Sequence, residues 1–266
     1  MDGHAGKSGR QGSGSSSRAL KQRLESLAAA GVSDLPSRRG AKGRAAVGSR
    51  TASRDPQPAA VTRPSSAAPA TATSADATAR SRALDILREE VAACRLCEPL
   101  ARARTHTVFG VGPATARLCF LGEAPGADED ASGEPFVGRA GQLLTKIIES
   151  CTLSREEVYI LNVLKCRPPE NRRPLPEETV NCRGYFEKQL EIIAPEFICC
   201  LGTTAAQALL QTDETIGELR KRWFSWRSSQ VICTYHPSYL LRNPPAKRDV
   251  WEDMKRLMSK LGVQLT

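Results

Sequence analysis

The pattern of apolar residues divides the chain near residue 80. Up to that point the chain is rich in Ser, Gly, Ala, Pro, Thr and Arg, and runs such as residues 12–17 and 64–73 lack apolar periodicity. Segments of this composition bury too little apolar surface to offset the entropy lost on folding. We therefore predict a disordered basic tail over residues 1–80 and a folded domain over residues 81–266.

Within the tail, Leu20, Leu24 and Leu27 recur at helical spacing ahead of Gly31, a plausible helix stop. This spacing predicts one short amphipathic helix, which is either a transient helix or an element that binds a partner. The acid-poor, Arg- and Ser-containing start is also compatible with an organellar transit peptide, although Asp2 and the early glycines weaken that interpretation.

From Ser81 onward, apolar residues recur with the periods of regular structure, and Leu84, Leu87 and Val91 mark a helix that runs into Cys94. Short β-forming runs then alternate with helical ones. The expected strands are residues 117–121, 158–163, 197–201 and 230–234, and the expected helices are residues 141–151, 177–193, 203–210 and 249–261. This alternation predicts an α/β domain whose mostly parallel sheet has helices on both faces.

Ligands of such sheets bind outside the carboxyl ends of the strands. The segments that follow the four expected strands are polar or rich in Gly and Pro, and they comprise residues 122–126, 165–168, 202–204 and 235–238. All four segments are expected at one edge of the sheet, so we predict the functional site there.

The formal net charge of +9 lies almost entirely in the tail. Residues 1–80 contain 13 Lys and Arg against 5 Asp and Glu, whereas residues 81–266 contain 25 against 24. A basic tail attracts polyanions regardless of their sequence, and salt weakens this attraction. The charge therefore does not identify a reaction, which must be sought in the folded domain.

Cysteine usage favours a reducing compartment. The nine cysteines are an odd number, and no apolar stretch resembles a secretory signal or a membrane span. Five of them lie in expected strands or at a helix end and are interpreted as small buried apolar residues; they are Cys119, Cys151, Cys199, Cys200 and Cys233.

The other four cysteines have the spacing of metal ligands. Cys94 and Cys97 form a CxxC pair at a helix end, and Cys166 and Cys182 add two thiolates with fifteen residues between them. Four thiolates can hold a zinc ion or an iron-sulfur cluster. Zinc ribbons usually use two tight CxxC pairs, so the wide second pair favours a cluster, with zinc and unligated cysteines as alternatives.

The loop over residues 122–141 combines glycines and prolines with the carboxylates of Glu123, Asp128, Glu129 and Asp130. It lacks the GxxxxGK[ST] pattern, and clustered carboxylates would repel a phosphate, so a neutral hydrogen-bonding ligand suits it better. Phe136 in this loop is either a core anchor or a platform on which a ring stacks.

Asn162 and His236 follow expected strands and allow two interpretations each. A buried Asn must find partners for both ends of its amide, which are either backbone groups or the edge of a bound base. His236 is one of three histidines and the only one that follows a strand. It is either structural or part of the site.

Together these segments resemble the family 4 uracil-DNA glycosylases, the iron-sulfur branch of the uracil-glycosylase superfamily. The resemblance runs from about Ala83 to Leu261. It rests on GEAPGADED from Gly122, PFVGRAGQLL from Pro135, LNVLKCRPPENRRP from Leu161 and YHPSYLLRNP from Tyr235, with the four cysteines at the family spacing.

The resemblance implies a three-layer α/β/α fold with a central four-stranded parallel sheet, one 4Fe-4S cluster on Cys94, Cys97, Cys166 and Cys182, and excision of uracil from DNA. It also implies which residues contact uracil: Glu123, Ala124, Pro125, Glu129, Phe136, Asn162 and His236. Asn171 matches a position linked to catalysis. A product-trapping relative has a basic insert after the strand of Asn162, but here Cys166 leads straight into Arg167. A monofunctional hydrolase is therefore expected.

In the mechanism that we expect, uracil leaves the DNA stack and lies on Phe136. His236 donates to O2, and Asn162 donates to O4 while it accepts from N3–H, a pattern that cytosine inverts. Glu123 positions the attacking water, with Asn171 as the alternative. Leu240 or Leu241 fills the vacated stack, and the phosphate contacts come from Arg172, Arg173, Ser238 and Arg242.

The expected partner is single- or double-stranded DNA that contains uracil, and the tail is expected to bind DNA or a repair or replication partner. We expect a monomer that contacts no membrane and works in a bacterial cytoplasm at the nucleoid, with organellar targeting by the tail as the alternative. Two other functions stay open: a non-catalytic nucleic-acid-binding module with the same fold, and a zinc-bound regulatory module.

Overall fold

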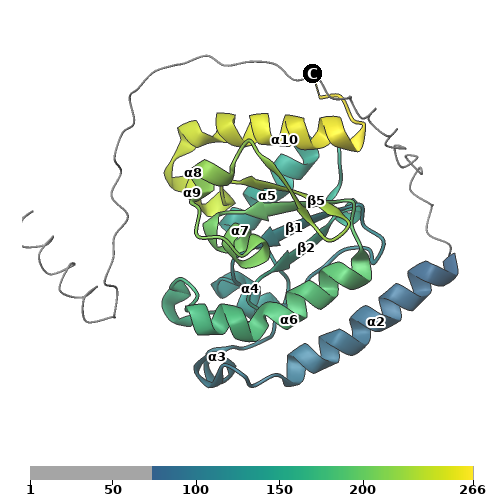
Figure 1. Cartoon of the computed structure of the whole chain (residues 1–266). Coiled ribbons are helices and arrows are strands. Elements are labelled where there is room, and N and C mark those ends of the chain that lie inside the picture. Colours follow the sequence, from purple (N-terminus) through teal and green to yellow (C-terminus); the bar gives the residue numbers. More distant parts are fainter. Residues whose placement is uncertain (1–73, 266) are drawn as a thin grey trace, which may run out of the picture. The chain divides into compact units, whose positions relative to one another are not determined.

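One twisted sheet forms the centre of the protein, whose computed structural model describes residues 74–265. The strands lie in the order β2-β1-β3-β5-β4 (Figure 1). Four of them are parallel: β1 (Leu118–Gly122), β2 (Tyr159–Asn162), β3 (Phe197–Leu201) and β5 (Ser229–Thr234). These four strands confirm the predicted parallel sheet.

The expected count of four strands is wrong by one, because β4 (Trp223–Trp226) pairs antiparallel with β5 at the edge of the sheet. The strand has only four residues and lies between Arg222 and Arg227, so its run of β-forming residues is too short to show a period of two. The turn at Arg227 has a φ of 51° and brings β5 back beside it.

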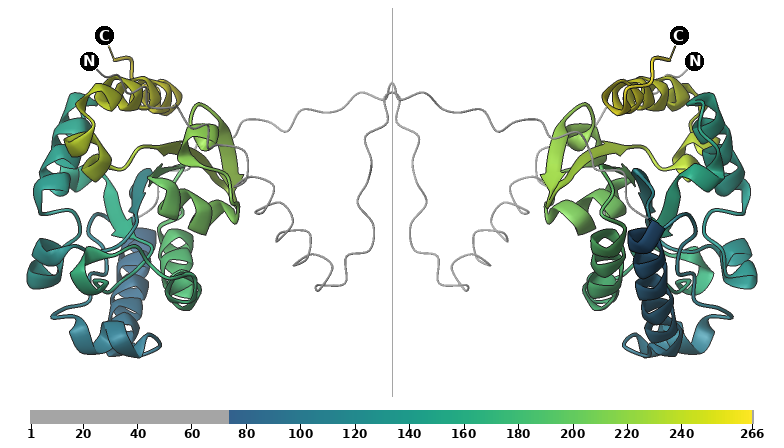
Figure 2. Two further views of the ribbon diagram at one scale, coloured as in Figure 1. Left: turned by 90° about the vertical axis from the view of Figure 1, so that its left-hand side faces the viewer. Right: turned by 90° about the vertical axis from the view of Figure 1, so that its right-hand side faces the viewer.

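Helices cover both faces of the sheet and make the predicted three layers (Figures 1 and 2). One face is covered by α6 (Pro176–Ile193), α7 (Thr203–Leu210) and α8 (Ile216–Leu219), with α2 (Ser74–Ala93) packed along α6. The other face is covered by α5 (Arg139–Ser150), α9 (Pro237–Arg242) and α10 (Lys247–Leu261). Shorter segments complete the fold: α3 (Glu98–Ala103), α4 (Ala127–Ser132) and the 3-10 turns η1 (Arg155–Glu157), η2 (Pro169–Asn171) and η3 (Pro244–Ala246).

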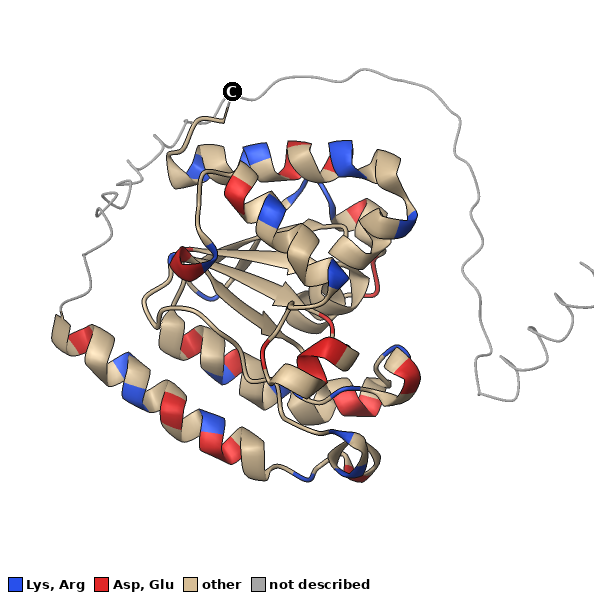
Figure 3. Ribbon diagram, turned by 180° about the vertical axis from the view of Figure 1, so that it is seen from behind, with Lys and Arg blue, Asp and Glu red and all other residues tan. Residues whose placement is uncertain are grey.

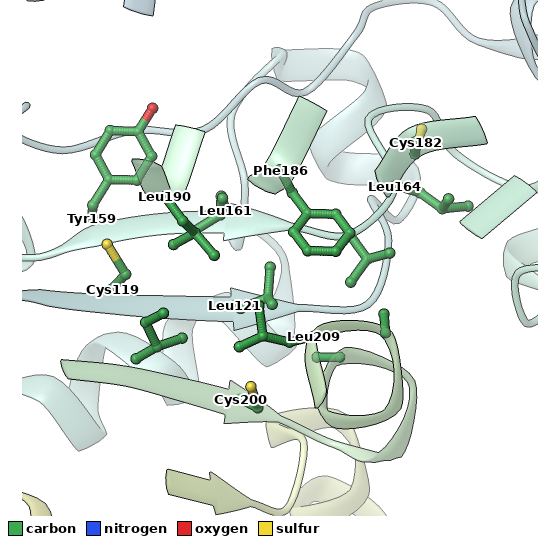
Figure 4. Packing of buried hydrophobic residues seen from close by; sticks show 14 of the residues in the cluster. Cys119, Leu121, Tyr159, Leu161, Leu164, Cys182, Phe186, Leu190, Cys200 and Leu209 are labelled. Carbon is green, nitrogen blue, oxygen red and sulfur yellow. The ribbon is translucent and has the colours of Figure 1, made fainter. Parts of the chain in front are cut away.

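The strands supply both cores because successive side chains point to opposite faces. In β1, Cys119 and Leu121 belong to the core beneath α6 and α7, whereas Leu118 and Phe120 belong to the core beneath α5 and α10. Figure 4 shows the first core, in which Phe186 and Leu190 of α6 pack against the sheet. None of the strands in the described region contains Lys, Arg, Asp or Glu, and the charged residues lie in helices and loops (Figure 3).

The expected boundary near residue 80 falls inside α2, which begins at Ser74. Residues 74–80 are therefore helical and do not belong to a disordered tail. Leu84, Leu87 and Val91 of this helix are buried as predicted. The expected helix around Leu20, Leu24 and Leu27 lies outside the described residues.

The five cysteines interpreted as apolar core residues are buried as predicted: Cys119, Cys151, Cys199, Cys200 and Cys233. Burial raises the pKa of Cys151 to about 11. This thiol is therefore protonated and unreactive at neutral pH. Among residues 74–265, no helix is both long and apolar enough to cross a membrane.

Candidate functional site

A cleft of about 780 Å³ opens at the carboxyl edge of the sheet, where it was predicted. This edge contains a topological switch point, because the chain continues from β1 to β2 on one side of β1, while β3 lies on its other side. All residues predicted for catalysis or uracil binding line this cleft, as do four of the predicted DNA contacts. They are Glu123, Ala124, Pro125, Glu129, Phe136, Asn162, Asn171, Arg172, Arg173, His236, Ser238 and Arg242.

Asn162 ends β2 and is 2% exposed, and its Oδ1 has no hydrogen-bond partner among the described residues. A buried amide oxygen without a partner is rare in proteins, because it has lost its water without gaining a bond. Because Asn162 lines the cleft, this oxygen is the candidate acceptor for a donor on a ligand bound there. The interpretation of Asn162 as a backbone-bonded structural residue is not supported.

Gly122, the last residue of β1, makes room for this amide. A Cβ at this position would lie 2.3 Å from Oδ1 of Asn162 and 2.5 Å from Cζ of Phe136. The close approach requires glycine on steric grounds alone. The two side chains that define the inner wall of the cleft therefore depend on a residue without a side chain.

We expect Gly122→Ala to lower the rate of uracil excision at least about tenfold, because displacing catalytic groups by about 1 Å has effects of this size or larger. Gly184→Ala in α6 is the matched control, since a Cβ there meets nothing within 4 Å. It should leave the rate unchanged and stabilise the helix by up to about 1 kcal/mol. Rates and melting temperatures of both variants test this expectation, and equal rates for the two would contradict it.

Phe136 is 6% exposed, belongs to the core beneath α5 and also lines the cleft, so the core interpretation is confirmed and stacking of a base on this ring stays a prediction. Its φ of 56° is unusual for an aromatic residue. The first turn of α5 packs tightly against this backbone, because a Cβ on Gly141 would lie 1.9 Å from the Phe136 carbonyl oxygen. Arg155 donates to the carbonyl of Pro135 at 2.5 Å. These contacts hold the ring in a strained backbone conformation at the wall of the cleft.

His236 caps the N-terminus of α9, and its Nδ1 accepts the backbone N–H of Ser238 at 3.1 Å. An accepting Nδ1 places the proton of the neutral ring on Nε2. Burial and, to a smaller extent, the positive charge of Arg242 lower the pKa of His236 to about 4. The ring is therefore neutral at pH 7, and Nε2–H is its only donor. Its centroid lies 5.6 Å from that of Phe136.

Glu129 lines the cleft, but both of its carboxylate oxygens bind backbone N–H groups. Oε2 accepts from Gly126 at 3.0 Å, and Oε1 accepts from Val137 and Gly138, each at 3.0 Å. The carboxylate thus ties the loop after β1 to the loop that carries Phe136. It supports the shape of the pocket, and a direct contact of Glu129 with uracil stays a prediction.

Glu123 and Asn171, the two candidates for positioning the attacking water, differ in the hydrogen bonds that they already accept. Glu123 is half-buried, and its Oε2 accepts from the hydroxyl of Thr204 at 2.5 Å. Asn171 is exposed, and its Oδ1 accepts from Nε of Arg167 at 2.8 Å. One carboxylate oxygen of Glu123 therefore makes no hydrogen bond within the described region, whereas the amide oxygen of Asn171 already accepts one.

The predicted DNA contacts divide by exposure. Arg172 forms two hydrogen bonds with the buried carboxylate of Glu178, at 2.6 and 2.9 Å, so this ion pair holds the loop after η2. Arg173 and Arg242 are exposed at the cleft, and no ion pair to either is formed within the described region. These two arginines keep their charge available for phosphate.

Leu240 and Leu241 are separated by burial. Leu240 is 1% exposed and packs in the core beneath α5, whereas Leu241 is 37% exposed on α9. Of these two residues, only Leu241 has the exposed side chain that is needed to enter a base stack. The structure thus excludes Leu240 from the wedge role.

Cys94, Cys97, Cys166 and Cys182 line one small cavity between α3, the loop after β2 and α6. Each sulfur has a polar neighbour. Arg104 donates to Cys166 at 3.0 Å and Asn181 donates to Cys97 at 3.4 Å. Tyr185 lies near Cys94 and the backbone of Lys165 near Cys182, where each affects the pKa of the neighbouring group. Within residues 74–265, no group of three or more His, Cys, Asp or Glu side chains is arranged to hold a metal ion.

Lys165 precedes Cys166 of the cysteine cavity and bonds the backbone of Asn162, which lines the cleft. Its side chain is 1% exposed, and Nζ donates to the carbonyls of Asn162 at 2.8 Å and Phe109 at 3.2 Å. One buried side chain thus fixes the backbone that carries the Asn162 amide, and it comes from the residue next to Cys166.

Several residues of the cleft were not assigned from the sequence. Thr203 lines the cleft and Thr204 bonds Glu123, and both follow β3 at the expected sheet edge, which was the available signal. Tyr235 and Tyr239 line the cleft with ring centroids 4.9 Å apart. Ile216 comes from the short helix α8, which was not predicted.

Comparison with known proteins agrees with this geometry. The model of the uracil DNA glycosylase superfamily matches residues 109–255. This range includes all five strands of the described region but not helix α2. The chain is 44% identical to the type-4 uracil-DNA glycosylase of Archaeoglobus fulgidus over 67% of this chain and 94% of that protein. It is also 44% identical to that of Thermotoga maritima, over 68% and 95%, and 40% identical to that of Saccharolobus solfataricus, over 67% and 87%. The chain therefore belongs to the uracil-DNA glycosylase superfamily.

Proposed function

We propose that the protein binds uracil extruded from DNA in this cleft and hydrolyses its N-glycosidic bond with Asn162 and His236 as the principal groups. As a member of the family, it is a DNA-repair glycosylase that removes uracil. The observation that carries the assignment of residues is the buried Oδ1 of Asn162, which has no partner in the described region and belongs to a residue that lines the same cleft as Phe136 and His236.

Asn162 selects uracil by the direction of its hydrogen bonds. Oδ1 accepts from N3–H of uracil, and the amide NH₂ then donates to O4. Cytosine presents an acceptor at N3 and a donor at its exocyclic amine, so both bonds would be lost. A site that buries such groups rejects the mismatched base strongly, because the amide would be left without partners.

His236 stabilises the charge that develops on the leaving base. Cleavage of the glycosidic bond leaves negative charge on the uracil oxygens, and a fixed donor stabilises this charge more than the neutral base. The contact of Nδ1 with the Ser238 N–H directs Nε2–H away from the helix that it caps. A neutral ring gives up no proton in this role, so it acts as a hydrogen-bond donor.

Water attacks the sugar after or during departure of the base. Glu123 is favoured over Asn171 for positioning this water, because its second carboxylate oxygen makes no hydrogen bond within the described region, while the amide oxygen of Asn171 already accepts one from Arg167. Thr204 fixes the carboxylate. The water supplies hydroxide to C1′ of the sugar, and its remaining proton goes to the departing base.

DNA binding uses the exposed groups around the cleft. Arg173 and Arg242 bind phosphates, and Leu241 enters the space that the uracil leaves. Arg172 contributes by holding its loop through Glu178 and not by its own charge. A monomer acting in the cytoplasm at the nucleoid, and binding of DNA or a protein partner by the tail, stay predictions.

We expect Leu241→Ala to lower excision from double-stranded DNA about tenfold more than excision from single-stranded DNA, because only a duplex must be opened and kept open. Leu240→Ala serves as the contrast: it should remove about 2–5 kcal/mol of stability without this preference. Parallel rate measurements on the two substrates test both. Equal losses on both substrates for Leu241→Ala would exclude the wedge.

We further propose that Cys94, Cys97, Cys166 and Cys182 hold a 4Fe-4S cluster. The four thiols share one cavity, and polar groups from Arg104, Asn181, Tyr185 and Lys165 lie near their sulfurs. Hydrogen bonds to ligand sulfurs are typical of bound clusters, whose negative charge they offset. The cluster would tie α3 and α6 to the loop after β2 and so order the wall of the cleft.

We expect Cys166→Ser to lose iron, to lower the melting temperature and to weaken DNA binding together, because this residue joins the cavity to the strand end that carries Asn162. Purified protein should be brown with broad visible absorption, and metal analysis should find iron and sulfide. Colourless protein that contains zinc would support the alternative centre. Cys151→Ser, a buried cysteine outside the cavity, is the control and should keep the iron.

An excision assay tests the proposed function as a whole. Oligonucleotides with a single uracil, in single- and double-stranded form, are incubated with the full chain and with a chain that lacks residues 1–73. Release of uracil and an abasic site by both chains supports the proposal. Binding of DNA without release by either chain would favour the non-catalytic nucleic-acid-binding module.

A further inference from the structure

A buried ion pair contacts Thr234 and Tyr235, the two residues that precede His236. Arg220 follows α8 and Asp253 lies in α10, and their side chains are 5% and 1% exposed. Nε of Arg220 donates to Oδ2 of Asp253 at 2.7 Å. The same oxygen accepts from the hydroxyl of Thr234, the last residue of β5, also at 2.7 Å. Two helices are thus joined to the end of one strand through a single carboxylate oxygen.

The pair also contacts the next residue along the chain. The guanidinium of Arg220 lies over the ring of Tyr235, with Cζ 4.3 Å from the centroid. Tyr235 lines the cleft and packs on Tyr239 of α9, and His236 follows it directly. Thr234 is held on its other side as well, because its carbonyl accepts the N–H of Gly202 at 2.8 Å. The chain is therefore fixed at the two residues before His236.

Stability alone gives a weak reason for this arrangement. Replacing a buried ion pair by apolar residues of similar volume is often neutral or stabilising. Here Nη2 of Arg220 and Oδ1 of Asp253 are buried without a partner in the described region, which makes the pair still less favourable. A costly group that persists beside a functional site is a candidate for a positional role.

We propose that Arg220, Asp253 and Thr234 are positioning residues, which fix the direction of the Tyr235–His236 segment and thereby aim Nε2–H of His236 into the cleft. They touch neither uracil nor the reacting bond. Because the proposal concerns how His236 is aimed, it rests on the proposed function of that ring. A donor displaced by about 1 Å loses most of its effect on a transition state.

The test replaces the ion pair by apolar residues in the variant Arg220→Met/Asp253→Leu. The variant should melt at or above the temperature of the parent protein. Its single-turnover excision rate should fall about 10- to 100-fold, and the imidazole ¹⁵N signals of His236 should shift. A surface pair nearby is the control: Arg222 and Glu214 are 2.7 Å apart and exposed, and Arg222→Gln/Glu214→Gln should keep the full rate.

A double-mutant cycle separates positioning from general damage. In a His236→Ala background the apolar pair should cause no further loss, because the ring that it aims is gone. A folded apolar-pair variant with the full rate would overturn the proposal, as would an equal loss in the His236→Ala background. If His236→Ala itself excised normally, the proposed function of that ring would fail first, so the two failures are distinguishable.

Thr234→Val tests the same idea if the apolar pair does not fold. It removes one hydroxyl at nearly constant volume and leaves the ion pair in place. The rate should fall several-fold, and Thr234→Ser, which restores the hydroxyl, should recover it. An unchanged rate in a folded Thr234→Val variant would overturn the proposal.

Discussion

His236→Ala should lower the single-turnover rate of uracil excision about 10²- to 10³-fold, the loss that follows removal of one preorganised donor to a developing negative charge. Binding of uracil-containing DNA should change much less, because the donor acts mainly when charge appears on the base. The rates are measured with enzyme in excess over a labelled oligonucleotide. His106→Ala is the matched control, since His106 lies outside the cleft and bonds the carbonyl of Asp130.

The rate should also be independent of histidine ionisation between pH 8 and pH 5, because burial lowers the pKa of His236 to about 4 and the ring stays neutral throughout. The sign for stability follows from linkage. The unfolded chain takes up this proton near pH 6.5, whereas the folded protein does so only near pH 4, so stability should decrease as pH falls across that interval. A rate that titrates near pH 6.5 in the parent but not in His236→Ala would contradict the neutral ring.

Asn162→Ala should reduce excision about 10²- to 10³-fold, because N3–H and O4 of the bound base would lose their partners in a site that excludes water. Asn162→Asp is the sharper variant. It keeps the size and the acceptor of the side chain but cannot donate to O4, and its charge opposes the charge that develops on the base. We expect its loss to equal or exceed that of Asn162→Ala.

Affinity for the free base provides the second measurement for Asn162. Both variants should bind uracil more weakly as an inhibitor, and the margin by which the protein prefers uracil over cytosine should shrink. The melting temperature should not fall in Asn162→Ala, since the removed Oδ1 is unpartnered among the described residues. Normal excision by both variants would refute the role of this amide, and a large loss of stability would point to a structural role instead.

The order of strands and helices could be predicted because local periodicity determines it. The four parallel strands and the helices α5, α6, α7 and α10 agree with the expected bounds to within two residues. Strand β4 and the short helices α3, α4, α8 and α9 were missed, since segments of four to six residues are too short to show a clear period. The boundary at residue 80 was misplaced because α2 begins in a stretch of small polar residues, where composition favours disorder but the helix continues from the apolar positions further on.

The chain by itself determined which chemistry is present: an amide and an imidazole at strand ends, four cysteines at ligand spacing, and a glycine-rich loop that suits a neutral ligand. These are properties of residue type and of the rule that parallel strands end at one edge. Only the tertiary structure decided which partners those groups have. It brought Glu129 to three backbone N–H groups and Arg172 to Glu178, buried Leu240 while exposing Leu241, and left Oδ1 of Asn162 without a partner. Hydrogen-bond partners and burial arise from residues far apart in the chain, so spacing along the sequence cannot reveal them.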